Sequence, residues 1–486
     1  MGKAALTRWE ITGLVLVLLG AGFFRLYKIT DYMTFLGDEG RDVLAVRAIV
    51  LGQHLPLVGP GTSIGNMYLG PLYYYLIAPS LLLANFSPVG PAAFVAIIGV
   101  ATVGLLWFLG RSWFGPLSAL SISALYALSP VVIIYSRSSW NPNIMPFFAL
   151  LAMIGIWQVW RFARWPWLIV TAVSLAFVLN SHYLGLLLFP PIFVFWWLPR
   201  KLPAAKRYTL VSVLLFLLLL SPLLWFDLRH GWNNFSAMKQ FFTDRQTTVN
   251  FKAYKALPNL WPIWTDINIT LLTAGNKALG SIVSVVVLLT LTLTLTKNRK
   301  LSPELILVAT WLGIGLVGLG LYKQHIYAHY FGFLFPVPFL LLGFVTKLAG
   351  YPLRLVGLVG IFFLLLFNLL NNPLRTGPNY QLARTQTVAQ FIDRQASGRP
   401  FNLALVAKTN YDAGYRYFLE LQNSPYRTIH QQLTDQLFVI CEIPDCQPVG
   451  HPLWEIAAFG WAKIDRSWDF PWGVKVYRLV HNPTGT

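Results

Sequence analysis

Long apolar segments separated by short polar turns fill the first 371 residues of the chain. Eleven of them reach the roughly 17–25 mostly apolar residues that a membrane-crossing helix needs. They cover about 11–27, 88–110, 117–136, 143–160, 165–181, 184–199, 208–226, 279–296, 304–322, 331–346 and 353–371. The first segment has no obvious small-residue cleavage site, so we expect a retained anchor rather than a signal peptide. The pattern predicts a polytopic α-helical membrane protein with about 11 transmembrane helices.

The basic residues predict how these segments are oriented. With the N-terminus in the cytoplasm, the inner turns hold fourteen basic residues and only two acids, Glu10 and Glu304. Such a bias in short loops is typical of the cytoplasmic side. An odd number of spans then places the C-terminus outside the cytoplasm, together with two long outer loops at about 28–87 and 228–278. The fourteen are Lys3, Arg8, Arg111, Arg161, Arg164, Arg200, Lys201, Lys206, Arg207, Lys297, Arg299, Lys300, Lys347 and Arg354.

The pattern changes after residue 371. Residues 372–486 hold 11 Lys and Arg and 9 Asp and Glu, whereas residues 1–371 hold 26 and 9. Helical periodicity at 385–394 and 412–421 alternates with strand-like runs at 401–407, 436–440 and 474–480, which is typical of an α/β domain. We therefore expect a transmembrane domain over 1–371 and a small extracytoplasmic α/β domain over 372–486. Four residues separate Cys441 from Cys446, and an oxidising compartment outside the cytoplasm would permit a disulfide between them.

Composition excludes several classes of protein. Of the 486 residues, 56% are hydrophobic and 11% are charged, against about 25% charged in an average soluble protein. These values exclude an ordinary soluble enzyme. Two cysteines exclude a disulfide scaffold and an iron–sulfur or zinc–thiolate site. The net charge of +19 is explained by the cytoplasmic turns, so we do not expect nucleic-acid binding.

Acidic residues are scarce in the membrane part and gather at one place. Three of its nine acids stand in Gly37-Asp38-Glu39-Gly40-Arg41-Asp42, and none occurs from residue 43 to 226. A carboxylate can take a proton from a hydroxyl or bind a hard cation. The cluster follows the first span on the predicted outer side. It indicates either a catalytic group or a solvated turn between two glycines.

The histidines of the membrane part fall on the same predicted side. They are His54, His182, His230, His325 and His329. By this map no span interior contains an ionisable side chain, whereas a proton- or ion-coupled transporter normally needs such groups inside the bilayer. The distribution favours chemistry at the outer interface.

Arg137 stands in a very short outer turn, Tyr135 to Asn143, where an arginine is unexpected. It is either an interfacial side chain that extends toward water or an anion clamp, because a guanidinium binds phosphate through two parallel hydrogen bonds. His182 and His329 occupy comparable span ends. Together the three could neutralise one lipid phosphate.

The order of these motifs resembles the GT-C fold glycosyltransferases, above all the protein O-mannosyltransferase family (family 39) and its bacterial relatives, which include the aminoarabinose transferase that modifies lipid A. The similarity covers most of residues 1–345. It rests on Gly37-Asp38-Glu39, the helix-like Asp42–Leu51, Gly70-Pro71-Leu72-Tyr73-Tyr74-Tyr75, Arg111–Gly115, Ser129-Pro130, Tyr135-Ser136-Arg137, His329-Tyr330-Phe331 and Phe335-Pro336-Val337-Pro338.

The resemblance implies transfer of a sugar from a polyprenyl-phosphate donor with inversion of the anomeric centre. Asp38 resembles the general base that deprotonates the acceptor hydroxyl, and Glu39 its partner for acceptor or metal. Arg137 resembles the residue that holds the donor phosphate, in a site expected to include His182, His329 and Tyr330. Two segments of the outer loop, about 39–51 and 71–85, would lie along the membrane surface over the site. Further candidates are Arg41, Asp42 and Asn141.

The sequence departs from the family at three of these places. Asn141 or Asn143 stands where the family often has Asp, His182 where relatives often have Lys, and His329 where they often have Arg. Two histidines would make phosphate binding sensitive to pH, or would hold a metal ion instead. A divalent metal cofactor stays open, with Asp38 and Glu39 as its candidate ligands.

The sequence therefore predicts a multi-pass membrane glycosyltransferase acting on the extracytoplasmic face. Its partners would be a lipid-linked sugar donor, an acceptor protein, lipid or glycan, and the membrane. Two alternatives are a transporter or flippase of a lipid-linked saccharide, and a scaffold that presents residues 372–486.

Overall fold

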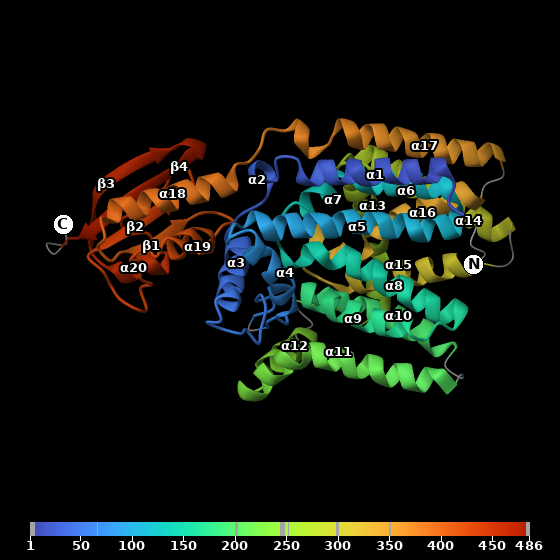
Figure 1. Ribbon diagram of the computed structural model, residues 1–486, viewed down its shortest axis with the longest axis horizontal. Helices are drawn as coiled ribbons and strands as arrows, with labels where there is room; N and C mark the ends of the chain where they lie inside the picture. The colour runs from blue at the N-terminus through green and yellow to red at the C-terminus, as the bar shows by residue number, and fades with distance from the viewer. Residues whose placement is uncertain are drawn as a thin grey trace. The chain divides into compact units, whose positions relative to one another are not determined.

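The computed structural model describes residues 5–65, 67–199, 203–243, 248–250, 252–297, 301–348 and 351–482. Five of the basic residues expected on the cytoplasmic side, Lys3, Arg200, Lys201, Arg299 and Lys300, lie outside these ranges. The chain forms two compact units (Figure 1). The helical unit comprises Met1–Tyr27, Leu55–Leu83 and Gly90–Gly377, and the α/β unit comprises Lys28–His54, Ala84–Val89 and Pro378–Thr486. Whether residues 372–486 form a domain of their own stays a prediction.

Six helices among the described residues are long and apolar enough to cross a membrane. They are α1 (Arg8–Leu26), α5 (Val89–Phe114), α8 (Met145–Phe162) with the short η1 (Asn141–Ile144), α11 (Pro203–Arg229), α15 (Pro303–Leu321) and α17 (Tyr351–Leu370). Two bent pairs raise the number to eight if each is one span. These are η3 (Ala253–Ala256) and α13 (Leu257–Leu272) with α14 (Lys277–Lys297), bent by 113°, and η4 (Ala328–Leu334) with α16 (Pro336–Leu348), bent by 48°.

The predicted count of eleven spans is not confirmed, although each expected segment is largely helical. The shorter apolar helices are α4 (Leu72–Leu83), α6 (Pro116–Leu128), α9 (Trp167–Ser181), and η2 (Tyr183–Leu188) with α10 (Phe189–Trp197). A span of about 20 residues is needed to cross the hydrocarbon core. The expected segment 117–136 is interrupted at Ser129, because Pro130 begins a new helix, α7 (Pro130–Tyr135).

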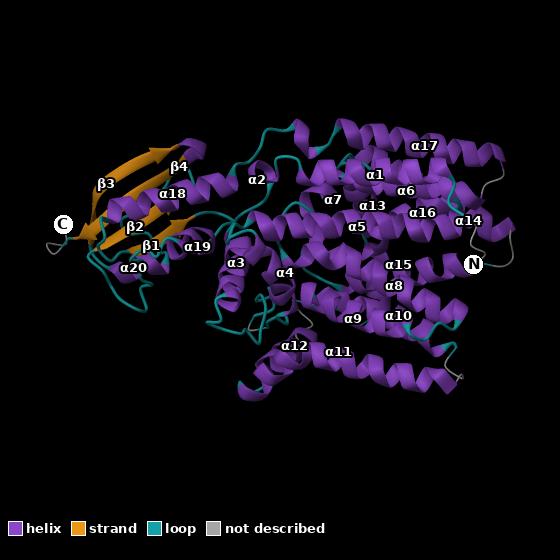
Figure 2. Ribbon diagram, viewed as in Figure 1, coloured by secondary structure: helices purple, strands orange, loops and turns teal. Residues whose placement is uncertain are grey.

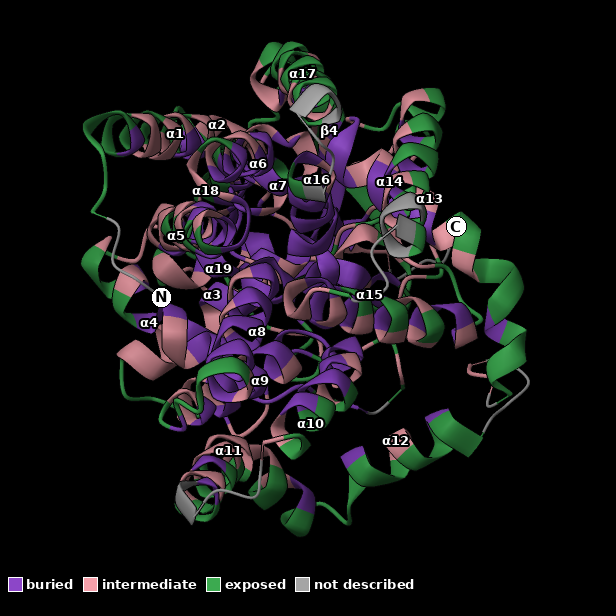
Figure 3. Cartoon of the chain, turned by 90° about the vertical axis from the view of Figure 1, so that its right-hand side faces the viewer, coloured by how far each residue is buried: buried purple, intermediate pink, exposed green. Residues whose placement is uncertain are grey.

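Burial separates the centre of the helical unit from its periphery. In the most apolar part of the η1–α8 segment, 83% of the residues are buried, whereas in that of α11 only 6% are. Figure 3 shows the difference along both helices. The exposed side chains of α11 include Leu210, Leu214 and Leu218. Exposed leucines along a long helix are what a lipid-facing surface requires.

The α/β unit contains a four-stranded sheet with the order β1-β2-β4-β3 (Figure 2). Its strands are β1 (Asn402–Val406), β2 (Gln436–Cys441), β3 (Ala462–Phe470) and β4 (Val474–His481). β1 and β2 are parallel, and the other pairs are antiparallel. The helices of this unit are α2 (Ile29–Tyr32), α3 (Gly37–Val50), α18 (Gln381–Ala396), α19 (Ala413–Leu421) and α20 (Trp454–Phe459).

Every residue of β1 and β2 is buried. Successive side chains of a strand point to opposite sides, so both faces of the sheet carry apolar side chains at these strands. On one face, Val439 and Leu479 pack in a cluster with Phe459 of α20. On the other, the rings of Phe438 and Trp468 stack, and Phe391 of α18 contacts Trp468 at 5.2 Å between ring centroids. The two helices and three strands predicted in this region are confirmed by α18, α19, β1, β2 and β4.

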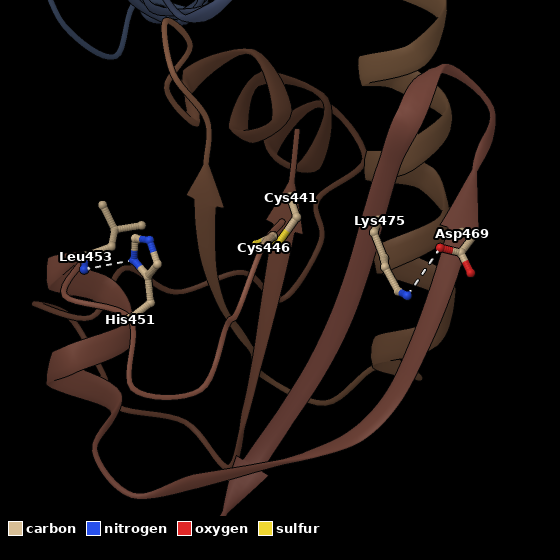
Figure 4. The surroundings of a disulfide bond; sticks show 6 residues. All are labelled: Cys441, Cys446, His451, Leu453, Asp469 and Lys475. Carbon is tan, nitrogen blue, oxygen red and sulfur yellow. Dashed lines mark hydrogen bonds and ion pairs between the residues drawn. A yellow bond between two sulfur atoms is a disulfide. The ribbon is translucent and has the colours of Figure 1, made fainter. Parts of the chain in front are cut away.

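Cys441, the last residue of β2, forms a disulfide with Cys446 (Figure 4). The bond closes a short loop that begins with Glu442. The remaining helical elements are α12 (Asn233–Thr243), η5 (Pro373–Arg375) and η6 (Pro471–Gly473).

Candidate active site

The acidic cluster lies in the first turns of a helix, α3, and not in a solvated turn. The residue before the helix, Leu36, has no side-chain oxygen, so it cannot accept from the unpaired amides of the first turn as Ser, Thr, Asp or Asn would. A distant residue supplies the acceptor instead. The Gly37 amide donates to Oδ1 of Asn410 at 2.8 Å, across 373 positions of sequence.

Asp38 is held through one of its two oxygens. Its Oδ1 accepts from the guanidinium of Arg41 at 2.8 Å and from the hydroxyl of Tyr411 at 2.8 Å. Within the described ranges, no group donates to its Oδ2. The side chain is 40% exposed. A carboxylate fixed at one oxygen and open at the other can accept a proton from a hydroxyl group that approaches it.

Glu39 is buried and caps the N-terminus of its own helix. It is 4% exposed, and its Oε2 accepts from the Leu36 amide at 3.0 Å, as a glutamate at the third helical position commonly does. Burial raises the pKa of Glu39 to about 7, and the neighbouring carboxylates Asp38 and Asp42 act in the same direction. Glu39 therefore caps the start of its own helix, and the role with acceptor or metal that the resemblance implies stays a prediction.

Arg41 joins the two remaining acids. It contacts Oδ1 of Asp38 at 2.8 Å and, through a second nitrogen, Oδ1 of the buried Asp42 at 2.7 Å. Oδ1 of Asp38 is thus occupied by this guanidinium, and Oε2 of Glu39 by the Leu36 amide. A divalent cation at Asp38 and Glu39 stays a prediction. Among the described residues, no group of three or more His, Cys, Asp or Glu side chains could hold one.

In the helical unit, the predicted donor-site residues His182, His329 and Tyr330 lie together. Their rings are 4.6 to 5.9 Å apart between centroids. Trp140 and Tyr183 pack against this group, 4.5 Å from His329 and 4.4 Å from His182 respectively. We call these five residues the histidine cluster. It gathers the ends of η1, α9 and η4.

His182 of this cluster is buried and accepts a backbone hydrogen bond. It stands in the turn between α9 and η2, and its Nδ1 accepts from the Leu184 amide at 3.2 Å. Burial, with a smaller contribution from His329, lowers the pKa of His182 to about 3. Since Nδ1 accepts, the proton of the neutral ring is on Nε2. His182 can therefore donate one hydrogen bond to a phosphate oxygen through Nε2, and its part in neutralising a lipid phosphate stays a prediction.

Arg137 is buried and donates to backbone carbonyls at the end of α1. Its two terminal nitrogens contact the oxygens of Phe24 at 3.3 Å and Tyr27 at 2.7 Å. Tyr135 and Trp140, which flank it in sequence, both contact the ring of His329. Arg137 thus links α1 to the turn that carries part of the histidine cluster, and its role as a phosphate clamp stays a prediction.

Asn141 explains one departure from the family pattern. Its amide nitrogen donates to the carbonyl of Ser181, next to His182, at 2.7 Å. An aspartate could not donate this bond. Nearby, Asn180 occupies the space that a side chain at Gly70 would fill, and Tyr73 contacts Ser139 through their hydroxyls at 2.8 Å. The Gly70–Tyr75 motif is thereby attached to the same helix ends.

A cavity of about 660 Å³ opens beside the histidine cluster. Tyr330 belongs to both, and the polar part of the cavity wall includes Ser63, Gln240 and Gln324. Amides, hydroxyls and aromatic rings are the groups that bind sugars, because they pair with hydroxyls and stack on the apolar faces of the ring. Sequence reasoning missed this cavity, whose wall comes from three separate stretches of chain.

Sequence reasoning also missed Tyr411 and Asn410, the partners of α3. No local pattern marks them, since a tyrosine and an asparagine in a soluble-like segment are common. The only available signal was indirect: the glycines on either side of Asp38 and Glu39, which sit inside a helix and allow other chain segments to approach closely.

Comparison with known proteins confirms the resemblance to GT-C glycosyltransferases. The family described as dolichyl-phosphate-mannose-protein mannosyltransferase matches residues 69–226. The structure is similar to ArnT from Cupriavidus metallidurans bound to undecaprenyl phosphate, with 12% identity, 98% of each chain covered and a TM-score of 0.59. No curated protein sequence matches the chain at a significant level.

The fold is also similar to that of the Archaeoglobus fulgidus oligosaccharyltransferase. The complex of this enzyme, AglB, with an inhibitory peptide and a dolichol-phosphate is 13% identical, with 87% of this chain and 65% of the other covered and a TM-score of 0.51. Its complex with zinc and sulfate is 14% identical, with 86% and 62% covered and a TM-score of 0.52. At these identities the likeness shows the fold, which is that of a multi-pass membrane protein of the GT-C type.

Proposed function

We propose that the chain is an integral-membrane glycosyltransferase that transfers a sugar from a polyprenyl-phosphate donor to an acceptor hydroxyl with inversion. The acceptor oxygen forms a bond to the anomeric carbon while the bond from that carbon to the phosphate oxygen breaks. The acceptor proton passes to Asp38, and polyprenyl phosphate leaves. ArnT with undecaprenyl phosphate and AglB with dolichol-phosphate support a lipid carrier of this kind.

The observation that carries the proposal is the hydrogen bonding of the Asp38 carboxylate. One oxygen is fixed by Arg41 and Tyr411, and the other has no donor within the described ranges. A positioned base of this kind contributes about 10²–10⁴-fold to a proton transfer. The other two carboxylates of the acidic cluster make structural contacts. Glu39 accepts from the Leu36 amide at the helix start, and Asp42 is buried against Arg41.

The histidine cluster is the proposed site of the donor phosphate. His182 and Tyr330 would donate hydrogen bonds to its oxygens, with His329 and Arg137 supplying further donors. The neighbouring cavity, at about 660 Å³, is large enough for a sugar ring.

Both sites would lie at the extracytoplasmic face. The excess of basic residues in the turns at the opposite helix ends supports this orientation, and Arg111 contacts Glu10 at 3.0 Å at that end of α1 and α5. The N-terminus would then be cytoplasmic, and the acidic helix and the C-terminal residues extracytoplasmic. Labelling of single cysteines introduced at exposed positions in intact cells tests the orientation.

The test of the proposal is Asp38→Asn in the purified full chain, reconstituted with a radiolabelled polyprenyl-phosphate sugar and a membrane extract as acceptor source. Asparagine keeps the acceptor for Arg41 and Tyr411 but cannot take a proton. We expect at least a 100-fold loss of sugar transfer with unchanged donor binding. Asp31→Asn, a matched change at an acid in the same unit, should retain activity. Full activity of Asp38→Asn would remove Asp38 as the base.

The phosphate site has a separate test. Arg137→Ala should raise the donor concentration needed for half-maximal transfer, and unchanged donor dependence would contradict the clamp. A wild-type chain that moves lipid-linked saccharide across a vesicle bilayer without transferring sugar would favour the transporter alternative over the enzyme.

A further inference from the structure

We propose that Tyr411, Asn410 and Glu442 are positioning residues for the catalytic carboxylate, so that residues far along the chain complete the acidic site. The inference rests on the proposed role of Asp38 as base. All of the contacts that support it lie within the α/β unit.

Tyr411 acts directly on the carboxylate. Its hydroxyl donates to the same oxygen of Asp38, Oδ1, that Arg41 contacts. Two donors on one oxygen fix the rotation of the carboxylate group and leave Oδ2 for the acceptor. Burial raises the pKa of Tyr411, so the phenol keeps its proton and remains a donor.

The sequence makes room for this contact. A Cβ at position 37 would overlap the ring of Tyr411. Gly37 therefore lets the tyrosine ring lie against the first turn of α3 and reach Asp38, one residue further along. The contact with Tyr411 therefore explains why a glycine stands at the first position of Gly-Asp-Glu-Gly.

Asn410 acts on the helix that carries the carboxylate. Its Oδ1 accepts from the amide of Gly37 at 2.8 Å, and its Nδ2 donates to both oxygens of Glu442, at 3.0 and 3.1 Å. The asparagine is thereby fixed in the orientation that places its oxygen at the helix start. Without it the first turn of α3 would keep an unpaired amide, and helix ends fray when their amides lack partners.

Glu442 is the anchor of this chain of contacts. It also accepts from the hydroxyl of Tyr415 at 2.6 Å and lies 3.2 Å from Arg384. It directly follows Cys441, whose disulfide to Cys446 fixes the start of the loop. The sheet, α18 and α19 therefore all contribute to holding the asparagine that begins α3.

The geometry predicts a loss of turnover without a loss of donor binding. Tyr411→Phe and Asn410→Ala should each lower kcat about 10-fold or more, with the donor KM unchanged, because the carboxylate is misplaced while the phosphate site is intact. Glu442→Gln, which touches neither Asp38 nor α3, should lower kcat through Asn410. Hydrogen exchange of the Gly37–Arg41 amides in the full chain should rise in Asn410→Ala and Glu442→Gln.

Two matched controls separate positioning from general stability. Tyr426→Phe removes a hydroxyl in the same unit that is not bonded to α3, and should leave kcat unchanged. Asn402→Ala removes the side chain that bonds Arg427, Gln432 and Thr434, and should destabilise the unit without a selective effect on exchange at Gly37–Arg41.

Wild-type kcat in both Tyr411→Phe and Asn410→Ala would overturn the inference. It would also be overturned if Asn402→Ala, at equal loss of thermal stability, lowered kcat by the same factor. Either result leaves Asp38 as base intact, whereas full activity of Asp38→Asn removes the base itself. The two failures are therefore distinguishable.

Discussion

The backbone of Gly414 in α19 lies directly against Gly40 of α3. A Cβ at Gly40 would overlap the backbone of Gly414. Backbone atoms cannot move aside as the end of a flexible side chain can, so the absence of a side chain here is what permits the contact between α3 and the C-terminal residues. The second glycine of Gly-Asp-Glu-Gly is thus explained by packing, as the first is by Tyr411.

Gly40→Ala should therefore destabilise the α/β unit. Forcing one methyl into a packed contact typically costs about 1–3 kcal/mol, and at this position it also pushes α3 away from Tyr411. Thermal unfolding followed by circular dichroism measures the loss. Gly22→Ala, at a helical glycine with open space around it, is the control and should be neutral or slightly stabilising. Equal unfolding temperatures for the two variants would contradict this account of the contact.

Glu39 makes stability depend on pH in a defined direction. Its pKa is raised from 4.5 to about 7 in the folded chain, so the folded state holds a proton between these values that the unfolded state has released. The stabilisation is complete below pH 4.5 and is lost as the pH rises through 7. A shift of this size corresponds to about 3 kcal/mol.

Glu39→Gln should flatten this dependence, since glutamine keeps a carbonyl for the Leu36 amide and does not titrate. Unfolding temperatures at pH 5 and pH 8 provide the measurement, and the difference between them should shrink in the variant. Glu420→Gln, at a side chain that is 40% exposed, should leave the difference as in the wild type. The same pH dependence in Glu39→Gln would assign it to another group.

We expect the contribution of His182 to phosphate binding to be independent of pH between 5 and 8. With its pKa lowered to about 3 by burial, it stays neutral from pH 5 to 8. His182→Ala should raise the donor KM about 10-fold, the effect of one hydrogen bond to a charged group. The ratio of variant to wild-type KM should be the same at pH 5, 6.5 and 8. A ratio that grows toward pH 5 would mean that His182 binds phosphate as a cation.

Much of the fold follows from local patterns in the sequence. Apolar stretches mark the positions of the membrane helices, and helical or strand-like periodicity marks five elements of the α/β unit. The number of spans does not follow, because a helix of 13 residues such as α6 has the composition of a span but not its length. β3 was missed because its residues, Ala462–Phe470, are mostly exposed and polar, and the strand exists through its pairing with β4.

The candidate site is predictable from the sequence in a similar, partial way. Asp38 could be found because acids are so rare in the apolar part of the chain that one cluster stands out. Its partners could not, because the Asp38–Tyr411 and Gly37–Asn410 contacts each join residues 373 positions apart. Local patterns contain no information on such pairs. The burial of Glu39 against the start of its own helix also required the structure, since burial does not follow from a local pattern.

The disulfide beside Glu442 links the stability of the C-terminal residues to the acidic site. Cys441→Ala/Cys446→Ala removes a short-loop cross-link, and a loss of about 2 kcal/mol in unfolding free energy is expected. Because Glu442 directly follows Cys441, the contact between Glu442 and Asn410 should loosen when the disulfide is removed. Sugar transfer should therefore fall further in the double variant than in Asn402→Ala at an equal loss of stability.

Transfer assays on both variants, with and without reductant, provide the measurement. Reductant should lower transfer in the wild type and have no effect on the double variant. Equal activity of the double variant and Asn402→Ala at matched stability would show that the loop does not act through Glu442.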